Sequence, residues 1–304
     1  MGKAHLELTD QLDLLVSRGM IVSDVTACLK ALGTIGYYRL SAYWHPLRRR
    51  SISSSGQLTV EDRFVDGTDF DKVLQLYEFD QNLRKVTFEQ IERLEVALRF
   101  QVGHTLGRTD PNAHKNPDFF EPDFVLRKSF SNALVSYEQS DHERLLHNIE
   151  REMRRSNDDF VAHHKAKYAG EMPIWAATEV MSLHHILELL RGLRTKHLNE
   201  VAEGFGLFDN SGVGAGGALR NWLERILELR NICAHHGRVW NRVFAKPLRL
   251  NHLRVFPETR HVRDLQIQHR EEIDNPAHKS TKRIYGVLLV MSVLNYRLGL
   301  NENW

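Results

Sequence analysis

The sequence is poor in cysteine and has no long apolar run. Its 304 residues include only Cys28 and Cys233, which lie far apart and form no CxxC pattern. Two thiols without a spacing pattern indicate a reducing compartment rather than a disulfide framework. A membrane-spanning helix needs about 18 or more consecutive apolar residues, and no such run occurs, so we expect no membrane association. The longest apolar stretch, IYGVLLVMSVLNY, predicts a buried helix instead.

Signals for export, metals and nucleotides are also missing. The N-terminal MGKAHLELTDQLDLL is acidic and amphipathic, unlike a signal peptide, so we expect a cytoplasmic protein. Without a CxxC or an HExxH, we expect neither zinc nor any other cofactor. The glycine-rich EGFGLFDNSGVGAGG lacks the GK[ST] of a phosphate-binding loop and follows no predicted strand. It is therefore interpreted as a flexible connector.

Positive charge is unevenly distributed. The net charge is only +2, but residues 220–270 contain ten arginines and one lysine against four acidic residues, or 11 − 4 = +7. A second cluster is Arg48–Arg50. A locally basic segment on a nearly neutral chain indicates a polyanionic partner. The alternative is a basic face that is merely solvated.

Apolar spacing of the helical type dominates the chain, and alternating strand patterns are rare. The fold class expected is all-α, a helical bundle with an N-terminal helical extension and an additional C-terminal helix. Helices are predicted over 5–18, 23–33 (N-cap Ser23, stop Gly33), 68 or 69 to 107, 128–168 with a break left open, 175–200, 218–236, and 280–298. The polar stretch 48–60 is predicted to be a loop. We expect an N-terminal helical region at 1–60 and a larger helical domain at 61–304.

The segment ELRNICAHHGRVWNR (228–242) places polar residues at the end of an apolar helix. On a helix, Trp222, Ile226, Leu229 and Cys233 form one apolar row, and Arg230 falls in the row beside it. A guanidinium at that position needs an anion or a wet cleft, because an unpaired buried charge costs several kcal/mol.

Arg230 and His235 cannot converge along one ideal helix. Five residues correspond to about 140° of rotation around the axis. The two side chains can therefore meet on one small group only if the helix ends there or if a second copy of the chain is present. We expect a homodimer, with the helix break at Ala234 as the alternative.

Arginine, asparagine and histidine together suit an RNA phosphodiester. Histidine can move a proton from a 2′-hydroxyl or to a leaving 5′-oxygen. Arginine can neutralise the charge that develops on phosphorus, and asparagine can orient either group. The spacing R-x(4–6)-H alone carries little information, because it also occurs by chance, for example at Arg99 and His104.

The longer string is more specific. RNICAHHGRVWNR (230–242) resembles the R-N-x-x-A-H-H-x-R-x-W-N-R signature of the Abi-like family of bacterial abortive-infection proteins, of the AbiD/AbiF type. Three further blocks are similar to that family in the same order: LGTIGYYRLSAYWHPL (32–47), the middle block in 64–100, and MPIWAATEVMSL (172–183). The resemblance covers most of the chain.

The resemblance implies membership of the HEPN superfamily, whose motif is a ribonuclease site. It implies an all-helical fold, metal-independent RNA cleavage at a site assembled from two motifs, and a role in phage defence or as a toxin. Residue by residue, Arg230, Asn231 and His235 fall on the superfamily motif and are the candidate catalytic residues. His236, Arg238, Trp240, Asn241 and Arg242 fall on the family extension, as candidates for RNA binding or for supporting the catalytic residues. The expected partner is RNA, as substrate or as regulator.

Other residues allow both a structural and a functional interpretation. Glu92, Glu95 and Arg99 share a face of the long helix, either as a structural ion-pair row or with Glu95 anchoring Arg230. The aromatic residues of GYYRLSAYW either belong to the core or, at Tyr37, Tyr38 or Trp44, stack on RNA bases. The adjacent pairs His163–His164 and His184–His185 diverge on a helix and make no ready metal site.

The sequence is compatible with three functions. The first is an endoribonuclease that acts as a toxin or antiphage effector. The second is a non-catalytic RNA-binding partner with the same fold. The third, a DNA-binding regulator, is weakened because SDVTACLKALGTIGYYRL offers few basic residues for a recognition helix.

Overall fold

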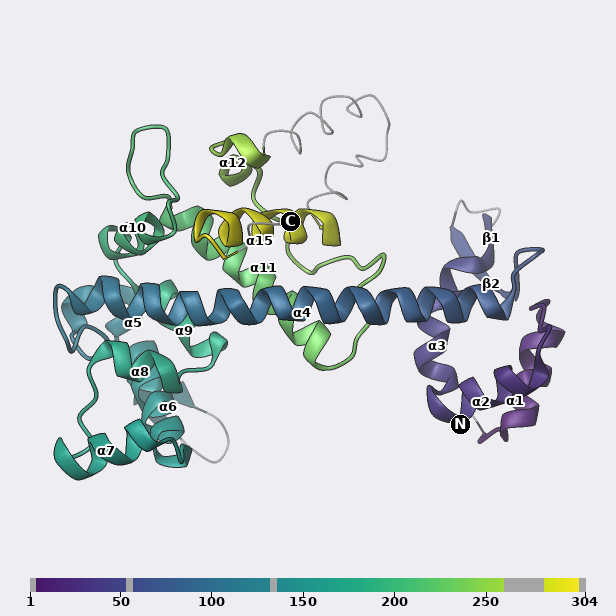
Figure 1. The fold of residues 1–304 in the computed structure, drawn as a ribbon, viewed down its shortest axis with the longest axis horizontal. Helices are drawn as coiled ribbons and strands as arrows, with labels where there is room; N and C mark the ends of the chain where they lie inside the picture. The colour runs from purple at the N-terminus through teal and green to yellow at the C-terminus, as the bar shows by residue number, and fades with distance from the viewer. Residues whose placement is uncertain (1–3, 53–56, 132–135, 260–281, 301–304) are drawn as a thin grey trace. The chain divides into compact units, whose positions relative to one another are not determined.

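The computed structural model describes residues 4–52, 57–131, 136–259 and 282–300 (Figure 1). Helices dominate this part of the chain, and the strands within it form two small sheets of two strands each. The mostly all-α class predicted from apolar spacing is therefore confirmed. No helix in the described ranges is long and apolar enough to cross a membrane.

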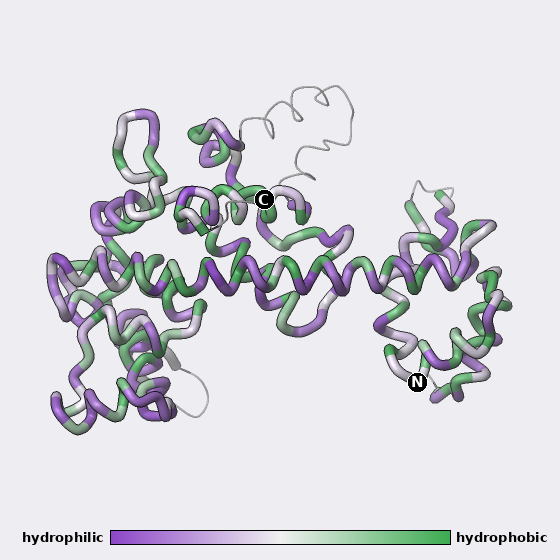
Figure 2. The backbone as a smooth tube through the Cα atoms, in the orientation of Figure 1, coloured by the Kyte–Doolittle hydropathy of each residue, from purple (hydrophilic) through white to green (hydrophobic). Residues whose placement is uncertain are grey.

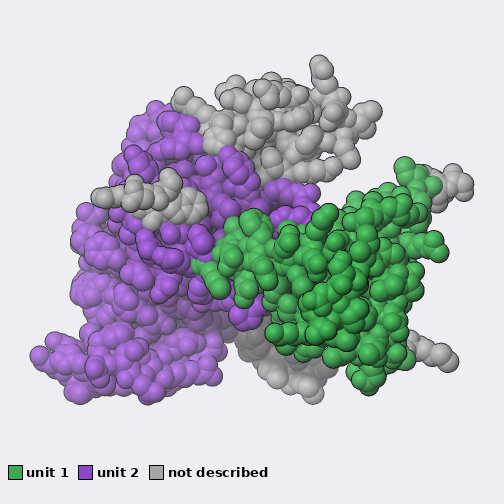
Figure 3. Space-filling view, turned by 45° about the vertical axis from the view of Figure 1, so that its right-hand side comes forward, with its two compact units in different colours: residues 1–85 green, residues 86–304 purple. Residues whose placement is uncertain are grey.

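The chain divides into two compact units, Met1–Lys85 and Val86–Trp304 (Figure 3). The dividing point lies inside a single long helix, α4 (Phe70–Gly107). The boundary expected at 60/61 would fall within strand β2.

Unit 1 combines short helices with one hairpin. Its elements are α1 (Leu8–Ser17), α2 (Val25–Thr34), α3 (Tyr37–Trp44), η1 (His45–Leu47), β1 (Arg48–Ile52), β2 (Leu58–Phe64) and the first part of α4. The two predicted N-terminal helices are present. However, the N-cap of α2 is Asp24, whose carboxylate accepts the Ala27 N–H at 2.9 Å, and not Ser23. The helix also continues past Gly33 to Thr34.

The loop predicted over 48–60 is wrong, because β1 and β2 form an antiparallel hairpin there. Arg50 pairs with Val60 and Ile52 with Leu58. Almost all of its side chains are exposed, so backbone hydrogen bonds hold the pair and no buried face imposes an alternating apolar pattern. The sequence signal for a strand is consequently absent.

A buried polar trio joins α3 to α4 within unit 1. Tyr43 Oη donates to Asp80 Oδ2 at 2.6 Å, and Arg84 Nη1 lies 2.5 Å from the same oxygen. Arg84 Nη1 also donates to Tyr43 Oη at 3.2 Å. Burial, followed by the hydrogen bond to Asp80, raises the pKa of Tyr43. Trp44 is fully buried beside the trio, so the base-stacking role considered for Trp44 is wrong.

The long helix α4 is confirmed at the predicted length. Hydrophilic and hydrophobic residues alternate along it (Figure 2), and its apolar face in unit 2 is buried through Ile91, Leu94, Leu98 and Val102. This periodic burial explains why the helix was predictable from sequence.

Unit 2 carries the remaining elements. They are η2 (Pro117–Phe119), α5 (Pro122–Val125), β3 (Lys128–Ser131), β4 (Ser136–Gln139), α6 (Asp141–Arg155), α7 (Asp159–Lys167), α8 (Ile174–Val180), α9 (Leu183–Gly192), α10 (Thr195–Gly204), α11 (Gly216–Ala234), α12 (Leu250–Leu253), η3 (Pro257–Thr259) and α15 (Ile284–Arg297). The last predicted helix is confirmed by α15, with 280 and 281 outside the described residues.

Two predicted helices of unit 2 are wrong in extent. The segment 128–168 begins with the β3–β4 hairpin and continues as two helices, α6 and α7. Ser140 starts α6 through a capping box with Glu143, which fixes the boundary. The segment 175–200 is divided into α8, α9 and α10, and the Ser182 hydroxyl accepts the His185 N–H at the start of α9. The apolar spacing continues across these turns, so only the capping residues mark where one helix ends and the next begins.

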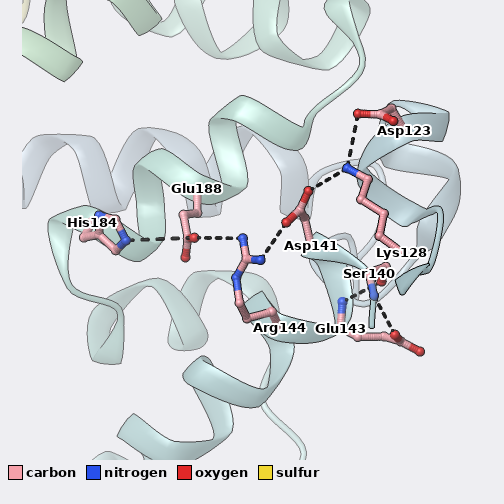
Figure 4. A network of polar contacts seen from close by, with 8 residues as sticks. All are labelled: Asp123, Lys128, Ser140, Asp141, Glu143, Arg144, His184 and Glu188. Carbon is pink, nitrogen blue, oxygen red and sulfur yellow. Dashed lines mark hydrogen bonds and ion pairs between the residues drawn. The ribbon is translucent and has the colours of Figure 1, made fainter. Parts of the chain in front are cut away.

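A chain of charged side chains ties the β3–β4 hairpin, α5, α6 and α9 together (Figure 4). Lys128 bridges Asp123 and Asp141, and Arg144 connects Asp141 at 2.7 Å to Glu188 at 3.5 Å. Partial burial works to raise the pKa of Asp141, but Lys128 and Arg144 together lower it below its usual value. The arrangement is a structural network that joins elements distant in sequence.

A buried histidine in unit 2 makes stability depend on pH. His114 is 2% exposed, and His142 Nε2 lies 2.8 Å from its carbonyl oxygen. The Nδ1 atom of His114 is buried and has no hydrogen-bond partner among the described residues. Burial first, and Lys115 second, lower the pKa of His114 from 6.5 to about 4.

The free energy of unfolding should fall as the pH is lowered from 6.5 towards 4, because the unfolded chain binds this proton first. The full loss is about 3 kcal/mol at about 1.4 kcal/mol per pKa unit. We expect His114→Leu to flatten the curve in this window, measured by urea unfolding at a series of pH values. The control replaces the exposed His147 with glutamine, and equal curves for His114→Leu and the wild type would contradict the assignment.

Candidate functional site

The motif helix α11 is the centre of the unit 2 core. Trp222, Ile226, Leu229 and Cys233, the row predicted to be apolar, are all buried. The helix packs against α9, α10 and α15. This burial fixes the rotation of α11 and therefore the direction in which its polar residues point.

The helix ends inside the motif. Ala234 is its last residue, His235 is the C-cap, and His236 adopts a left-handed conformation with φ of 55°. The N–H of His236 donates to the Cys233 carbonyl at 3.0 Å, and the N–H of Gly237 donates to Ile232 at 2.8 Å. This is the hydrogen-bond pattern of a Schellman cap, in which the left-handed residue is usually glycine. A histidine there costs about 1 kcal/mol or more, the kind of strain that clusters at functional sites.

Arg230 lies beside the buried row, as predicted, and is held from α4. Its Nε donates to Glu95 Oε1 at 3.1 Å, and its guanidinium lies 6.0 Å from the centre of the Phe88 ring. The Arg230 side chain is 37% exposed, whereas Glu95 is 15% exposed. The carboxylate thus fixes the guanidinium and leaves part of it accessible to solvent.

Glu95 serves two arginines at once. Its Oε2 lies 3.7 Å from Arg99 Nη2, and Arg99 also donates to the Met181 carbonyl at 3.3 Å. Both readings of the Glu95 row are therefore realised, the ion pair along α4 and the anchor for Arg230. Glu92 is exposed and forms no ion pair within the described residues.

The other two residues of the core motif face solvent. Asn231 and His235 are exposed, and the His235 side chain makes no hydrogen bond to any described residue. His236 is also exposed. The helix end thus presents one amide and two imidazoles at the surface, next to the half-exposed Arg230.

The extension after the cap folds back as a tight turn. The Arg238 guanidinium lies 5.9 Å from the Trp240 ring centre, and Arg242 Nη1 lies 3.4 Å from the Arg238 carbonyl oxygen. Asn241 has a left-handed φ of 52°. Its side-chain oxygen accepts from Arg283 Nη1 at 2.7 Å.

Sequence reasoning missed the residues that hold this turn and the segment 245–249 after it in place. Arg283, just before α15, carries no motif signal. On α11, Arg225 is buried and contacts Glu228 at 2.7 Å and the Lys246 carbonyl at 3.2 Å. Glu228 Oε1 accepts the Ala245 N–H at 3.0 Å, and Asn221 accepts the Arg249 N–H at 2.9 Å. The spacing 221, 225, 228 places these polar residues on one face of the helix, and this pattern could have indicated a structural clamp.

The described residues contain no group of three or more histidine, cysteine or acidic side chains arranged to hold a metal ion. The pairs His163–His164 and His184–His185 have ring centres 6.1 and 6.0 Å apart, and the rings within each pair are steeply inclined to one another.

The fold and the site define a mostly helical protein that presents an Arg-Asn-His cluster at the capped end of a buried helix. No curated protein and no solved structure matches the chain. A family model described as Abi-like protein matches residues 30–241, which is more than half of the sequence. The chain belongs to the Abi-like protein family, and this membership points to abortive infection, a defence against phage.

Proposed function

We propose that the protein is a metal-independent endoribonuclease that acts as an abortive-infection effector or toxin. The observation that carries the proposal is the exposed His235 at the cap of α11, five residues after an arginine that Glu95 holds in place. The HEPN assignment suggested by the motif belongs to the same proposal.

Each residue has a defined task in the proposed reaction. A histidine removes the proton from the 2′-hydroxyl, whose oxygen attacks the adjacent phosphorus. The bond to the 5′-oxygen breaks, and that oxygen takes up a proton. The products are a 2′,3′-cyclic phosphate and a 5′-hydroxyl. Arg230 stabilises the charge that develops on the phosphoryl oxygens, and Asn231 orients the phosphate or the imidazole.

Two copies of the chain would supply the second proton-transfer group. The surface position of Asn231, His235 and His236 suits a site shared across a twofold axis, since such an interface presents the same patch from both chains. The helix end at Ala234 also keeps the single-chain alternative available. The homodimer is therefore part of the proposal and has its own test below.

One contact favours a second candidate, a non-catalytic RNA-binding partner. The charge of Arg230 is already partly neutralised by Glu95 at 3.1 Å, which weakens its pull on a phosphate. In that case the protein would bind RNA through its exposed cations without cutting it.

Cleavage of labelled RNA should proceed at an unchanged rate in EDTA, because the proposed chemistry uses only protein side chains. We expect products that end in a 2′,3′-cyclic phosphate or its hydrolysis product, detected by mass spectrometry. Complete loss of cleavage in EDTA with recovery in Mg²⁺ would contradict the proposal. RNA that is bound but never cut would favour the second candidate.

A further inference from the structure

Unit 1 contains a cavity of about 720 Å³ that the motif site does not involve. This volume falls in the range of about 300–1,000 Å³ that is usual for ligand pockets. Its walls come from the segment before α1, from α1, and from the α2–α3 junction. The residues that matter for the argument are Leu6, Gln11, Leu14, Arg18, Tyr37 and Tyr38.

The aromatic wall of the cavity is held in place on one side and open on the other. The Tyr37 ring packs edge-on against the buried Trp44, with ring centres 5.1 Å apart and an angle of 70°. Arg18 Nη1 donates to Tyr37 Oη at 3.2 Å. Tyr38, in contrast, is 77% exposed, and its ring lies 5.8 Å from that of Tyr37. The two tyrosine rings are nearly perpendicular, at 79°, so a planar ligand that stacks on the exposed face of Tyr38 would be steeply inclined to Tyr37.

At one point of the cavity wall the backbone is accessible, because the residue there is a glycine without a side chain. Gly36 lines the cavity with φ of +91°, and a Cβ placed there would meet no atom within 4 Å. The left-handed conformation favours glycine, so this wall stays free of a side chain. A planar group can therefore approach the main chain beside Tyr37.

A line of arginines leads from the cavity to the hairpin. Asp62 on β2 lies 3.4 Å from Arg18 Nη2 and 3.2 Å from Arg48 Nη1. The N–H of Phe64 also donates to the Arg18 carbonyl at 2.8 Å, so the end of α1 is fixed to the hairpin. Arg50, farther along β1, is exposed and forms no ion pair within the described residues. Arg49 is paired with Asp66 at 2.5 Å, so Arg50 is the arginine of this strand that no described carboxylate neutralises.

We propose that this cavity holds one unpaired base of a single-stranded RNA, with a neighbouring phosphate at Arg50 of β1. Every base has a π-face that stacks on tyrosine or arginine, and the Tyr37 hydroxyl offers a polar contact to its edge. Leu6 and Leu14 supply apolar surface around the ring. The choice of RNA rests on the proposed function, whereas the cavity and its aromatic wall do not.

The stacking is tested with a short single-stranded RNA that carries 2-aminopurine, whose fluorescence is quenched when the base stacks. The full-length His235→Ala protein is used throughout, so that the probe stays intact. We expect quenching on binding, and we expect Tyr38→Ala to weaken binding by about tenfold or more and to reduce the quenching. Tyr38→Phe should retain both, because it keeps the ring.

The matched control is Tyr296→Ala, which removes a similarly exposed tyrosine from α15 in unit 2 and should change neither signal. Replacing the 2-aminopurine with an abasic site should abolish the difference between the His235→Ala protein and its Tyr38→Ala derivative. Arg50→Ala should make the slope of log K against log salt shallower by about 0.7, the value for one phosphate contact on a single strand. An unchanged affinity and quenching in Tyr38→Ala would overturn the base pocket.

This result is independent of cleavage. Quenching that depends on Tyr38 in a protein whose wild type cuts no RNA would support the pocket and contradict the proposed ribonuclease. Normal cleavage without quenching would support the proposed ribonuclease and contradict the base pocket.

Discussion

Replacing His235 with alanine should lower the rate of RNA cleavage by about 10²–10⁴-fold, the usual contribution of a positioned acid or base. The side chain is exposed and makes no hydrogen bond to a described residue, so the folded protein should keep its stability. The rate is measured with labelled RNA under single-turnover conditions, and stability by urea unfolding. The control is His147→Ala, which removes another exposed histidine.

One further variant and one mixing experiment separate the roles around His235. Arg230→Ala should also inactivate the enzyme, but it leaves the largely buried Glu95 with Arg99 as its only ionic partner among the described residues and can lower stability. If two chains share a site, inactive His235→Ala and Arg230→Ala proteins refolded together should recover part of the activity. A wild-type monomer that cuts RNA at full rate at nanomolar concentration would rule out the shared site. Cleavage by His235→Ala at the wild-type rate would remove His235 from the mechanism.

Asp80→Ala should reduce the free energy of unfolding by about 3–5 kcal/mol, the usual effect of breaking a buried ion pair on one side. Asp80 is 0% exposed, and its loss leaves the Arg84 guanidinium, in a side chain only 8% exposed, without the carboxylate. The Tyr43 hydroxyl loses its acceptor as well. The change is measured by urea unfolding of the full chain, followed by tyrosine and tryptophan fluorescence.

Two controls bracket this prediction. Tyr43→Phe removes one hydroxyl and should cost about 1–3 kcal/mol, as for a buried hydrogen bond to a charged group. Glu78→Ala removes an exposed carboxylate two residues before Asp80 on the same helix and should change stability by less than about 0.5 kcal/mol. A loss below about 1 kcal/mol for Asp80→Ala would mean that the trio does not hold α3 on α4.

The long and strongly periodic elements were predictable from sequence. The helix α4 and the motif helix α11 bury one continuous apolar row each, and that row is the signal that apolar spacing measures. The strands Arg48–Ile52 and Leu58–Phe64 were not predictable in this way, because almost all of their side chains are exposed. The turns that divide α8, α9 and α10 depend on local capping by residues such as Ser182, which a window of apolar spacing averages away.

The site was predictable only in part, for a related reason. The position of Arg230 beside the core followed from helical geometry. The anchoring of Arg230 by Glu95 was one of the two interpretations of the row of Glu92, Glu95 and Arg99. From the sequence, the end of the helix at Ala234 is only an alternative, because a left-handed histidine is an unfavourable cap and gives no sequence signal. Arg283 could not be assigned, since a contact between positions 241 and 283 depends on the tertiary fold.

The contact between Asn241 and Arg283 bears on the smallest piece of this chain that can fold. The family match ends at residue 241, yet Asn241 is held by Arg283, and the N–H of Phe244 donates to the Lys282 carbonyl at 2.8 Å. Beyond them, α15 covers α11 with Val287, Val290, Met291 and Leu294, all buried. A fragment cut at the end of the family match would leave that apolar surface open to water and release the turn after the cap. The part of the chain that must fold to hold the motif in place therefore extends beyond residue 241, where the family match ends.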